Sequence, residues 1–420
     1  MAFRFIHTGD LHLDSPLTGL RSLDDPRANE VALAPRRAFE TLVDTAIREK
    51  VDAFLIAGDL WDGDWRDISA GLFVQEQAGR LKAAGIGVFA ILGNHDAATE
   101  VSHRIRNLGT LHLFGSDRPQ SVPFKDAVIH GVSYGQREVQ DNLALTYPAG
   151  IPGKINIGLL HTSLNGREGH APYAPCSVDE LSQKGYDYWA LGHVHRQEIV
   201  AHRPASQGGT IAYCGVLQGR HIQERGPKGA LLVSVADGIA DVRPITISHV
   251  EWAEVRADVS GNTLPKVAME RALEAIAAHV SADVMPIRVT LKGETDQHFQ
   301  LRSSMRALTE LAQFIASGLA GGRLLLESVA VATTPAAGPA ERLPEAFGRY
   351  LQRAADDAGV RSVTGEELSK MVSSLHAGTR QLLLKRMPEL AVFDAGGDPD
   401  QLLRDALARV EARLTGPREV

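Results

Sequence analysis

The sequence has few cysteines and few aromatic residues, and each scarcity excludes a class of protein. Two cysteines, Cys176 and Cys214, in 420 residues cannot form the disulfide framework of a small secreted domain. Aromatic residues make up 5% of the chain, which argues against a surface of exposed rings that stacks nucleic-acid bases. The first residues turn polar too early for a signal peptide, and no apolar run nears the roughly 18 residues of a membrane span. We therefore expect a cytoplasmic protein without a membrane segment.

The chain also lacks an excess of positive charge, since its formal net charge is −7. A protein that coats nucleic acid by charge alone is normally basic, so the composition argues against that class. Bound metal ions can still supply positive charge at one site. The length predicts two or three domains at about 150 residues each, and a hydrophobic content of 44% is typical of globular proteins.

Five short apolar runs are each followed directly by a cluster of Asp, His, Asn or Gly. Continuous apolar runs of this length indicate strands buried on both faces. The segments 35–50 and 70–84 are expected to be helices, so the order predicts βαβ units with the polar clusters at the carboxyl edge of one sheet. Runs at 211–213 and 229–235 are expected in a second sheet. The five runs are 3–6, 53–57, 88–92, 155–160 and 188–191.

The pattern changes near residue 250, which is the predicted end of a first domain, 1–250. Residues 251–332 alternate strands and helices without a metal-type cluster, which indicates a small separate α/β domain. Residues 333–344 are rich in Pro, Ala and Gly and read as a linker. Residues 345–420 are predicted to be helical, with an apolar face that either binds a partner or packs on the chain's own domains.

Seven side chains in the polar clusters are ligands of divalent transition metals. Asp10 and His12 are two residues apart, as are His193 and His195, so an extended backbone would point each pair to one side. Seven ligands suit two ions that share a carboxylate, and Asp59 comes from a central cluster. The predicted ligands are Asp10, His12, Asp59 and His195 for one ion, and Asp59, Asn94, His161 and His193 for the other.

This ligand set predicts both the metal type and the chemistry. Four imidazoles among seven ligands favour Mn, Fe or Zn over Mg or Ca. Two divalent ions outweigh two carboxylates, so the site would attract a phosphodiester anion and could activate a water molecule for hydrolysis. His95 lies outside the ligand set and is predicted to be the general acid for the leaving alkoxide or a donor to the phosphoryl oxygens.

Other polar residues near the clusters have two interpretations each. Asp14 either orients the ligand histidine before it or forms a turn. Asp96 is expected to orient a neighbour rather than to bind metal. Asp62 either contacts substrate or belongs to a solvated loop. Arg220 and His221 follow a predicted strand, where they either contact a phosphate or lie on the surface.

The motifs GDLH, GDLW, GNHD and GHVH, in this order, resemble the calcineurin-like metallophosphoesterase superfamily. Within it, residues 4–250 are similar to the SbcD-like nucleases of DNA double-strand-break repair. The resemblance implies a two-layer β-sandwich flanked by helices, a dinuclear centre most typical of Mn²⁺, and cleavage of DNA phosphodiesters. It also implies that 251–332 is a capping domain, and that the protein works with an SMC-like coiled-coil ATPase and often as a homodimer.

Two departures from the resemblance leave its details open. Relatives usually carry a His two residues after the GDL segment, where this chain has Asp62, so exonuclease and endonuclease action both stay open. A Pro-Gly turn is also replaced by Tyr213-Cys214-Gly215. Two other functions remain as alternatives. One is a metallophosphatase or cyclic-nucleotide phosphodiesterase, although a phosphomonoester dianion calls for an Arg or Lys that GDLWDG lacks. The other is a non-catalytic regulatory subunit of an ATPase complex.

Overall fold

The structure is a computed structural model that describes residues 2–15, 26–62, 69–97, 109–165, 173–261 and 263–336. The chain divides into two compact units, Met1–Thr334 and Pro335–Val420, and nearly all described residues belong to the first. Within these residues no helix has both the length and the apolar character of a transmembrane span. The predicted helical region 345–420 and most of the predicted linker 333–344 lie outside the described residues.

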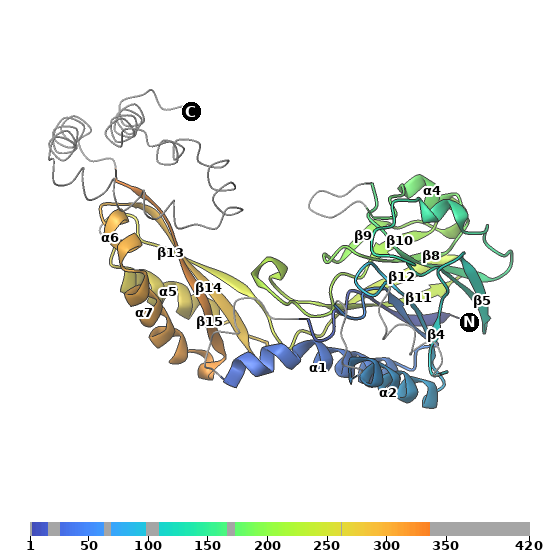
Figure 1. Ribbon diagram of the computed structural model, residues 1–420, viewed down its shortest axis with the longest axis horizontal. Helices are drawn as coiled ribbons and strands as arrows, with labels where there is room; N and C mark the ends of the chain where they lie inside the picture. Colours follow the sequence, from blue (N-terminus) through green and yellow to red (C-terminus); the bar gives the residue numbers. More distant parts are fainter. Residues whose placement is uncertain are drawn as a thin grey trace, which may run out of the picture. The chain divides into compact units, whose positions relative to one another are not determined.

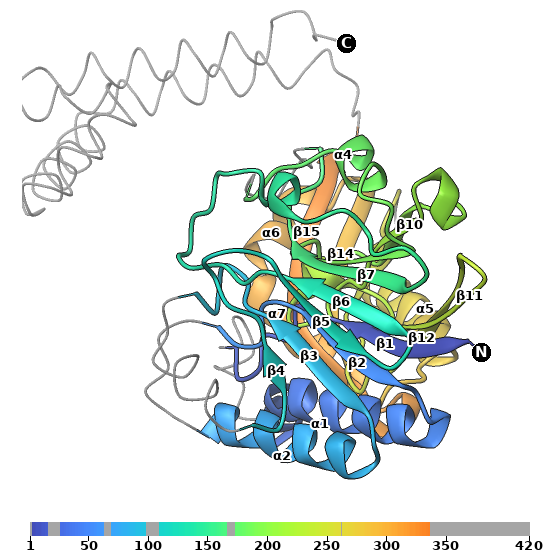
Figure 2. The same cartoon turned by 90° about the vertical axis from the view of Figure 1, so that its right-hand side faces the viewer.

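Two six-stranded sheets pack face to face in the N-terminal part of the chain (Figures 1 and 2). The first contains β1 (Phe3–Thr8), β2 (Ala53–Ala57), β3 (Gly87–Ile91), β4 (His112–Leu113), β11 (Gly229–Ala236) and β12 (Ile239–Thr246). The second contains β5 (Gln120–Phe124), β6 (Ala127–Gly131), β7 (Ile155–His161), β8 (Tyr188–Gly192), β9 (Glu198–Ala201) and β10 (Thr210–Tyr213). The strand orders are β12-β11-β1-β2-β3-β4 and β5-β6-β7-β8-β10-β9. The predicted α/β sandwich flanked by helices is therefore confirmed.

The five predicted strands are present, but they are divided between the two sheets. β1, β2 and β3 run parallel in the first sheet, whereas β7 and β8 run parallel in the second. The prediction of a single shared sheet edge is wrong, and so is the placement of 229–235 in the second sheet, because β11 pairs antiparallel with β1. Strands buried on both faces look alike in sequence whichever sheet they join. The polar clusters still meet because β2 contacts both β7 and β8 across the sandwich.

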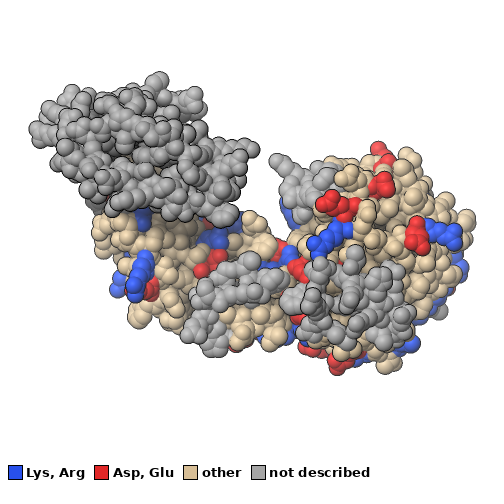
Figure 3. Space-filling model, viewed as in Figure 1, with Lys and Arg blue, Asp and Glu red and all other residues tan. Residues whose placement is uncertain are grey.

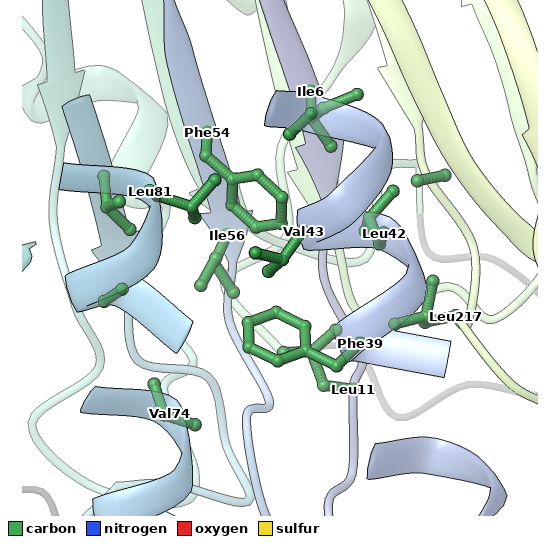
Figure 4. Close-up of a cluster of buried hydrophobic side chains, with 14 of the residues drawn as sticks. Ile6, Leu11, Phe39, Leu42, Val43, Phe54, Ile56, Val74, Leu81 and Leu217 are labelled. Carbon is green, nitrogen blue, oxygen red and sulfur yellow. The ribbon is translucent and has the colours of Figure 1, made fainter. Parts of the chain in front are cut away.

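Helices α1 (Pro26–Glu49) and α2 (Ser69–Ala83) cover the outer face of the first sheet (Figure 2). Figure 4 shows Phe39 and Leu42 of α1 packing with Ile6, Phe54 and Ile56 of the strands. Each such buried side chain contributes about 1.5–3 kcal/mol relative to an exposed one. The apolar stripe of the predicted helix is thus confirmed. On the outer face of the second sheet lies the short helix α4 (Val178–Ser182).

Helix α1 begins nine residues before the predicted start at residue 35. Its first turns are held by the C-terminal part of the unit: Arg27 donates to the carbonyl of Leu324 at 3.0 Å. Val31 packs in a cluster that contains Val250 and Trp252. Such contacts, formed with residues more than 200 positions away, cannot be read from local helix spacing.

Residues 253–335 form a smaller α/β layer pair with its own core. Its elements are β13 (Ala253–Asp258), α5 (Pro265–Ala277), β14 (Met285–Thr295), α6 (His298–Ser303), α7 (Met305–Ser317) and β15 (Leu324–Pro335), with the strand order β13-β14-β15. Ser304 separates α6 from α7. Residues 333–335, which the composition assigns to the linker, complete β15, where Thr333 contacts His298 at 2.9 Å.

His7 of β1 is a core histidine rather than a metal ligand. Its ring is fully buried, and its two nitrogens contact the hydroxyl of Tyr188 at 2.9 Å and the carbonyl of Leu191 at 3.2 Å. Burial penalises the charged imidazolium and lowers the pKa of His7 from 6.5 to about 3. Between these two pH values the unfolded chain binds a proton that the folded chain does not. Acidification therefore favours unfolding.

We predict that His7→Gln reduces the pH dependence of stability. In the wild type, lowering the pH from 7 to 5 should cost about 2 kcal/mol through His7 alone. Urea unfolding at both pH values measures this loss, and the variant should show a loss smaller by about that amount. The exposed His279→Gln is the matched control. Equal losses in wild type and His7→Gln would contradict the assignment.

Candidate metal centre

The backbone that carries the predicted ligands is not extended. β1 ends at Thr8, and Asp10 and His12 then adopt left-handed φ angles of 47° and 43°. Asp59 and His193 do the same, with φ of 52° and 95°. Few non-glycine residues adopt this conformation, and it persists where the surrounding fold holds it. The side-by-side placement predicted from strand alternation is therefore achieved by tight turns instead.

Two glycines allow the turns to approach one another. Gly58 has φ of 96°, and a Cβ there would lie 2.5 Å from Nδ1 of His161. A Cβ on Gly93 would lie 2.2 Å from Oδ1 of Asp59. At Gly58 the positive φ permits a sharp exit from β2, whereas at Gly93 the requirement is space for the neighbouring Asp59 carboxylate.

The structure brings the predicted ligands together from five chain segments. Asp10, His12 and His195 offer ligand atoms within 4.8 Å of one another, and so do Asp10, Asp59 and His161. Oδ2 of Asp59 lies 3.8 Å from Nε2 of His12 and 3.5 Å from Nε2 of His161. Asp59 thus lies near a histidine of each group, as a shared carboxylate requires, and Asp10 is common to both groups.

The second group continues through Asn94. Its Oδ1 lies 3.0 Å from Nε2 of His161 and 3.3 Å from Nδ1 of His193. The backbone N–H of His193 donates to both carboxylate oxygens of Asp10, at 3.0 and 3.1 Å. Asn94 therefore joins His161 and His193, in the grouping that the sequence predicts for the second ion.

Three of the imidazoles use one ring nitrogen in a hydrogen bond that points away from the centre. Nδ1 of His12 contacts Asp62 at 2.6 Å, Nδ1 of His195 contacts Glu224 at 2.7 Å, and Nδ1 of His161 contacts the carbonyl of Ala57 at 2.9 Å. Each partner is an acceptor, so each Nδ1 donates. In a neutral imidazole this leaves a lone pair on Nε2, directed at the centre.

Whether a metal ion fits the site depends on how these inward lone pairs are arranged. Nε2 of His12 and Nε2 of His195 face each other at 3.1 Å, and Nε2 of His161 faces oxygens of Asn94 and Asp59. A proton can bridge one such pair at a time, whereas two divalent ions can bind all of the donors together. The donor chemistry therefore fits a dinuclear centre.

The two carboxylates at the centre are buried, with Asp10 0% and Asp59 1% exposed. Burial raises the pKa of Asp10 despite the opposing effect of His195 and His161. At Asp59 burial also acts to raise the pKa, but His161 and His12 outweigh it and lower the pKa. Two buried carboxylates this close repel each other, and metal cations would remove that repulsion.

Asp62 belongs to the site and not to a solvated loop. Its Oδ1 accepts from His12 at 2.6 Å and from Nδ1 of His95 at 2.7 Å, and its Oδ2 accepts from Nη1 of Arg220 at 2.9 Å. Burial acts to raise the pKa of Asp62, but the hydrogen bonds from His12 and His95 hold it far below its usual value. Asp62 is therefore an anion that links a predicted ligand, the predicted general acid and an arginine.

His95 is the most exposed of the predicted site histidines at the centre, with 44% of its side chain accessible. Its hydrogen bond to Asp62 raises the pKa of His95 above its usual value. Its backbone N–H donates to Oδ1 of Asp59 at 3.0 Å, which fixes it beside the centre. Because Nδ1 is committed to Asp62, Nε2 is the nitrogen left for a substrate.

The remaining predicted residues have different outcomes. Asp96 orients its surroundings as predicted, since its carboxylate accepts from the backbone N–H groups of Leu60, Trp61 and Gly93. Asp14 does not orient His12, which is bound by Asp62. Asp14 instead pairs with Arg36 of α1, with Nε to Oδ1 at 2.7 Å.

Arg220 and His221 lie beside the centre, in the segment that contains Glu224. Arg220 donates to Glu224 at 3.0 Å and to Asp62, and Nε2 of His221 lies 3.5 Å from Glu224. Burial lowers the pKa of His221. Whether either residue contacts a phosphate stays a prediction. The sequence does not reveal the role of Glu224, because its partner His195 lies 29 residues away and no motif connects them.

Residues 3–197 match the family model of calcineurin-like phosphoesterases, and residues 252–334 match the middle domain of metallophosphoesterase YhaO. The chain carries a calcineurin-like phosphoesterase domain. Domains of this family use a dinuclear divalent metal centre, and the site described above provides candidate ligands for one. The resemblance predicted from the motifs is confirmed.

Known relatives extend the likeness beyond the phosphoesterase domain. The uncharacterized metallophosphoesterase YhaO of Bacillus subtilis is 38% identical over 262 residues, which cover 61% of this chain and 63% of YhaO. The DNA double-strand break repair protein Mre11 of Haloferax volcanii is 28% identical, over 69% of this chain and 62% of that protein. Mre11 of Sulfurisphaera tokodaii is 27% identical, over 58% of this chain and 62% of that protein. The matches thus span 62–63% of the length of these relatives.

We predict that Glu224→Gln weakens one of two metal sites. Loss of a carboxylate that orients a ligand histidine typically reduces metal affinity by roughly 10–100-fold, and Glu224 contacts His195 alone among the predicted ligands in the described structure. Calorimetric titration of metal-free protein with Mn²⁺ measures both sites. Glu310→Gln, on the exposed face of α7, is the control. Two unchanged affinities would contradict the assignment of His195 as a ligand.

Proposed function

We propose that the protein is a phosphodiesterase that uses two divalent metal ions to cleave DNA. The observation that carries the proposal is the convergence of inward-facing imidazole nitrogens around Asp10 and Asp59, next to the Asp62–His95 pair. Two bound divalent ions would activate a water molecule and stabilise charge on the phosphoryl oxygens. A complete donor set of this kind supports an enzyme rather than a non-catalytic regulatory subunit.

In this proposal His95 protonates the leaving oxygen when the phosphorus–oxygen bond breaks. Asp62 accepts the Nδ1 proton and so fixes the orientation of the ring, with Nε2–H directed outward. The raised pKa keeps more of His95 in the protonated, donating form near neutral pH. Arg220 holds Asp62 in turn, so it acts on the reaction through Asp62 and His95.

The charge around the site favours a phosphodiester over a phosphomonoester. A monoester dianion calls for an arginine or lysine beside the metals that is available to bind it. Arg220 lies there, but its guanidinium is bound by both Asp62 and Glu224. Its positive charge is therefore balanced within the protein, which favours the monoanionic diester.

DNA as the substrate is supported by the likeness to relatives named as DNA double-strand break repair protein Mre11. The imidazole-rich donor set supports Mn²⁺, with Fe or Zn as the alternatives. We propose, from the same likeness, a cytoplasmic role in DNA repair, an SMC-like coiled-coil ATPase partner and a homodimer. Co-purification of the tagged protein with a coiled-coil ATPase, identified by mass spectrometry, tests the partner.

We predict that His95→Ala lowers kcat on DNA by roughly 10²–10⁴-fold, the usual contribution of a general acid. The variant should still bind two Mn²⁺ ions, because His95 lies outside the predicted ligand set. Initial rates on a DNA oligonucleotide, together with metal analysis, measure the two properties. His279→Ala should behave as wild type. Retention of full activity by His95→Ala would remove this residue from the mechanism.

We further predict that the Mn²⁺-loaded protein hydrolyses DNA and bis-p-nitrophenyl phosphate faster than p-nitrophenyl phosphate or a cyclic nucleotide. For p-nitrophenyl phosphate the reason is the balanced charge of Arg220, which leaves no free cation for a dianion at that position. A cyclic nucleotide is a monoanionic diester, so its slower cleavage is expected from the likeness to relatives named for DNA repair. A panel of the four substrates at equal concentration gives the ranking. Preference for the monoester would support a metallophosphatase, and preference for the cyclic nucleotide would support a cyclic-nucleotide phosphodiesterase.

A further inference from the structure

A cavity of about 800 Å³ opens beside the metal centre. His195 and Glu224 form part of its lining, so the cavity and the centre share a wall. Residues 244–246 at the end of β12 also line it. This volume is in the range of about 300–1,000 Å³ typical of ligand sites. Apart from His195 and Glu224, none of these lining residues has a role in the chemistry proposed above.

The lining of the cavity carries more positive than negative charge. Its cations are Arg196, Arg225 and Lys228, and among the described lining residues its one carboxylate is Glu224. Glu224 is already bound by Arg220 and His195. The cations of the lining therefore set the sign of the charge that a ligand in the cavity would meet.

The three cations differ in how many of their N–H groups are already bound within the protein. Arg225 pairs with Glu254 of β13 at 2.5 Å, and Nζ of Lys228 donates one hydrogen bond to a backbone carbonyl at 2.7 Å. Arg196 is exposed and forms no ion pair with the described residues. Arg196 and Lys228 therefore keep N–H groups that can bind an anion.

The rest of the lining fits sugar but not base stacking. Val216, Pro227, Pro244 and Ile245 give the cavity aliphatic walls, and no Phe, Tyr or Trp is among its lining residues in the described structure. Recognition of single strands through bases depends on aromatic stacking. A strand bound here would accordingly be held through its phosphates and sugars, without preference for a base.

Two hydrogen bonds hold one part of the cavity lining in place without a ligand. Nε1–H of Trp252 donates to the carbonyl of Gly219 at 3.1 Å, and the N–H of Gly226 donates to the carbonyl of Trp252 at 3.0 Å. These bonds hold the segment that contains Glu224, Arg225 and Lys228. A site held in its binding conformation loses less free energy to ordering when it binds.

We propose that this cavity holds the DNA strand next to the scissile phosphodiester, with Arg196 and Lys228 contacting the neighbouring phosphates. The proposal rests on the proposed function and adds to it a substrate with more than one phosphate. Local cations are needed because the chain is acidic overall, with a net charge of −7. On the face shown in Figure 3, Lys and Arg side chains lie beside Asp and Glu rather than forming one broad basic surface.

The first test measures binding without catalysis. Fluorescence anisotropy of a labelled thymidine oligonucleotide, with full-length metal-free protein, gives Kd over a range of NaCl concentrations. In the variant Arg196→Gln/Lys228→Gln, the slope of log binding constant against log salt should become shallower by about 1.4, or about 0.7 for each phosphate that the variant no longer binds. An oligoadenylate should bind as tightly as the thymidine strand.

The control variant Lys154→Gln/Arg306→Gln removes the same charges elsewhere. Lys154 precedes β7 at the end opposite His161, and Arg306 is 94% exposed on α7. It should leave the slope as in wild type. An unchanged slope for Arg196→Gln/Lys228→Gln, or an equal change in the control, would overturn the proposal.

The second test separates this proposal from the proposed function. With Mn²⁺, the Arg196→Gln/Lys228→Gln variant should lose far more kcat/KM on the oligonucleotide than on bis-p-nitrophenyl phosphate, which has no neighbouring phosphate. Equal losses on the two substrates would overturn the cavity's role while leaving the phosphodiesterase intact. If wild type cleaves neither substrate, the proposed function fails, and the salt slopes still decide whether the cavity binds DNA.

Discussion

The site depends on hydrogen bonds that point away from it. Asp62, Glu224 and the carbonyl of Ala57 each accept the Nδ1 proton of one imidazole, and so direct the opposite nitrogen inward. Inward lone pairs beside two buried carboxylates are stable only around a cation or a shared proton. The partners outside the ligand set thus orient the donors so that they fit metal ions, and Asp62 also accepts a hydrogen bond from His95.

The β-sandwich supports this arrangement because it brings together the carboxyl ends of the strands that precede the clusters, which are β1, β2, β3, β7 and β8. Left-handed turns at Asp10, His12 and Asp59 place donors where strands could not, and Gly93 leaves the space that the Asp59 carboxylate occupies. Such backbone conformations cost of order 1–3 kcal/mol each. Burial of apolar residues on both faces of the first sheet offsets that cost.

The sequence predicts the identities of the candidate site residues better than it predicts their arrangement in space. Residue type and order are sufficient to predict the ligand candidates and His95, because metal donors directly after strands are rare by chance. Local spacing cannot predict which sheet β7 or β11 joins, since strands buried on both faces have the same pattern. It also cannot reveal Glu224 or the position of Asp62, whose contacts join segments 29 and 50 residues apart. The partner of Asp14 is hidden for the same reason, because Arg36 reaches it from α1.

We propose that two metal ions bind on either side of Asp59. Anomalous diffraction from crystals grown with Mn²⁺ would locate them. We expect two peaks roughly 3.5–4 Å apart, one beside His12 and His195 and the other beside Asn94, His161 and His193. A single peak, or peaks away from Asp59, would contradict it.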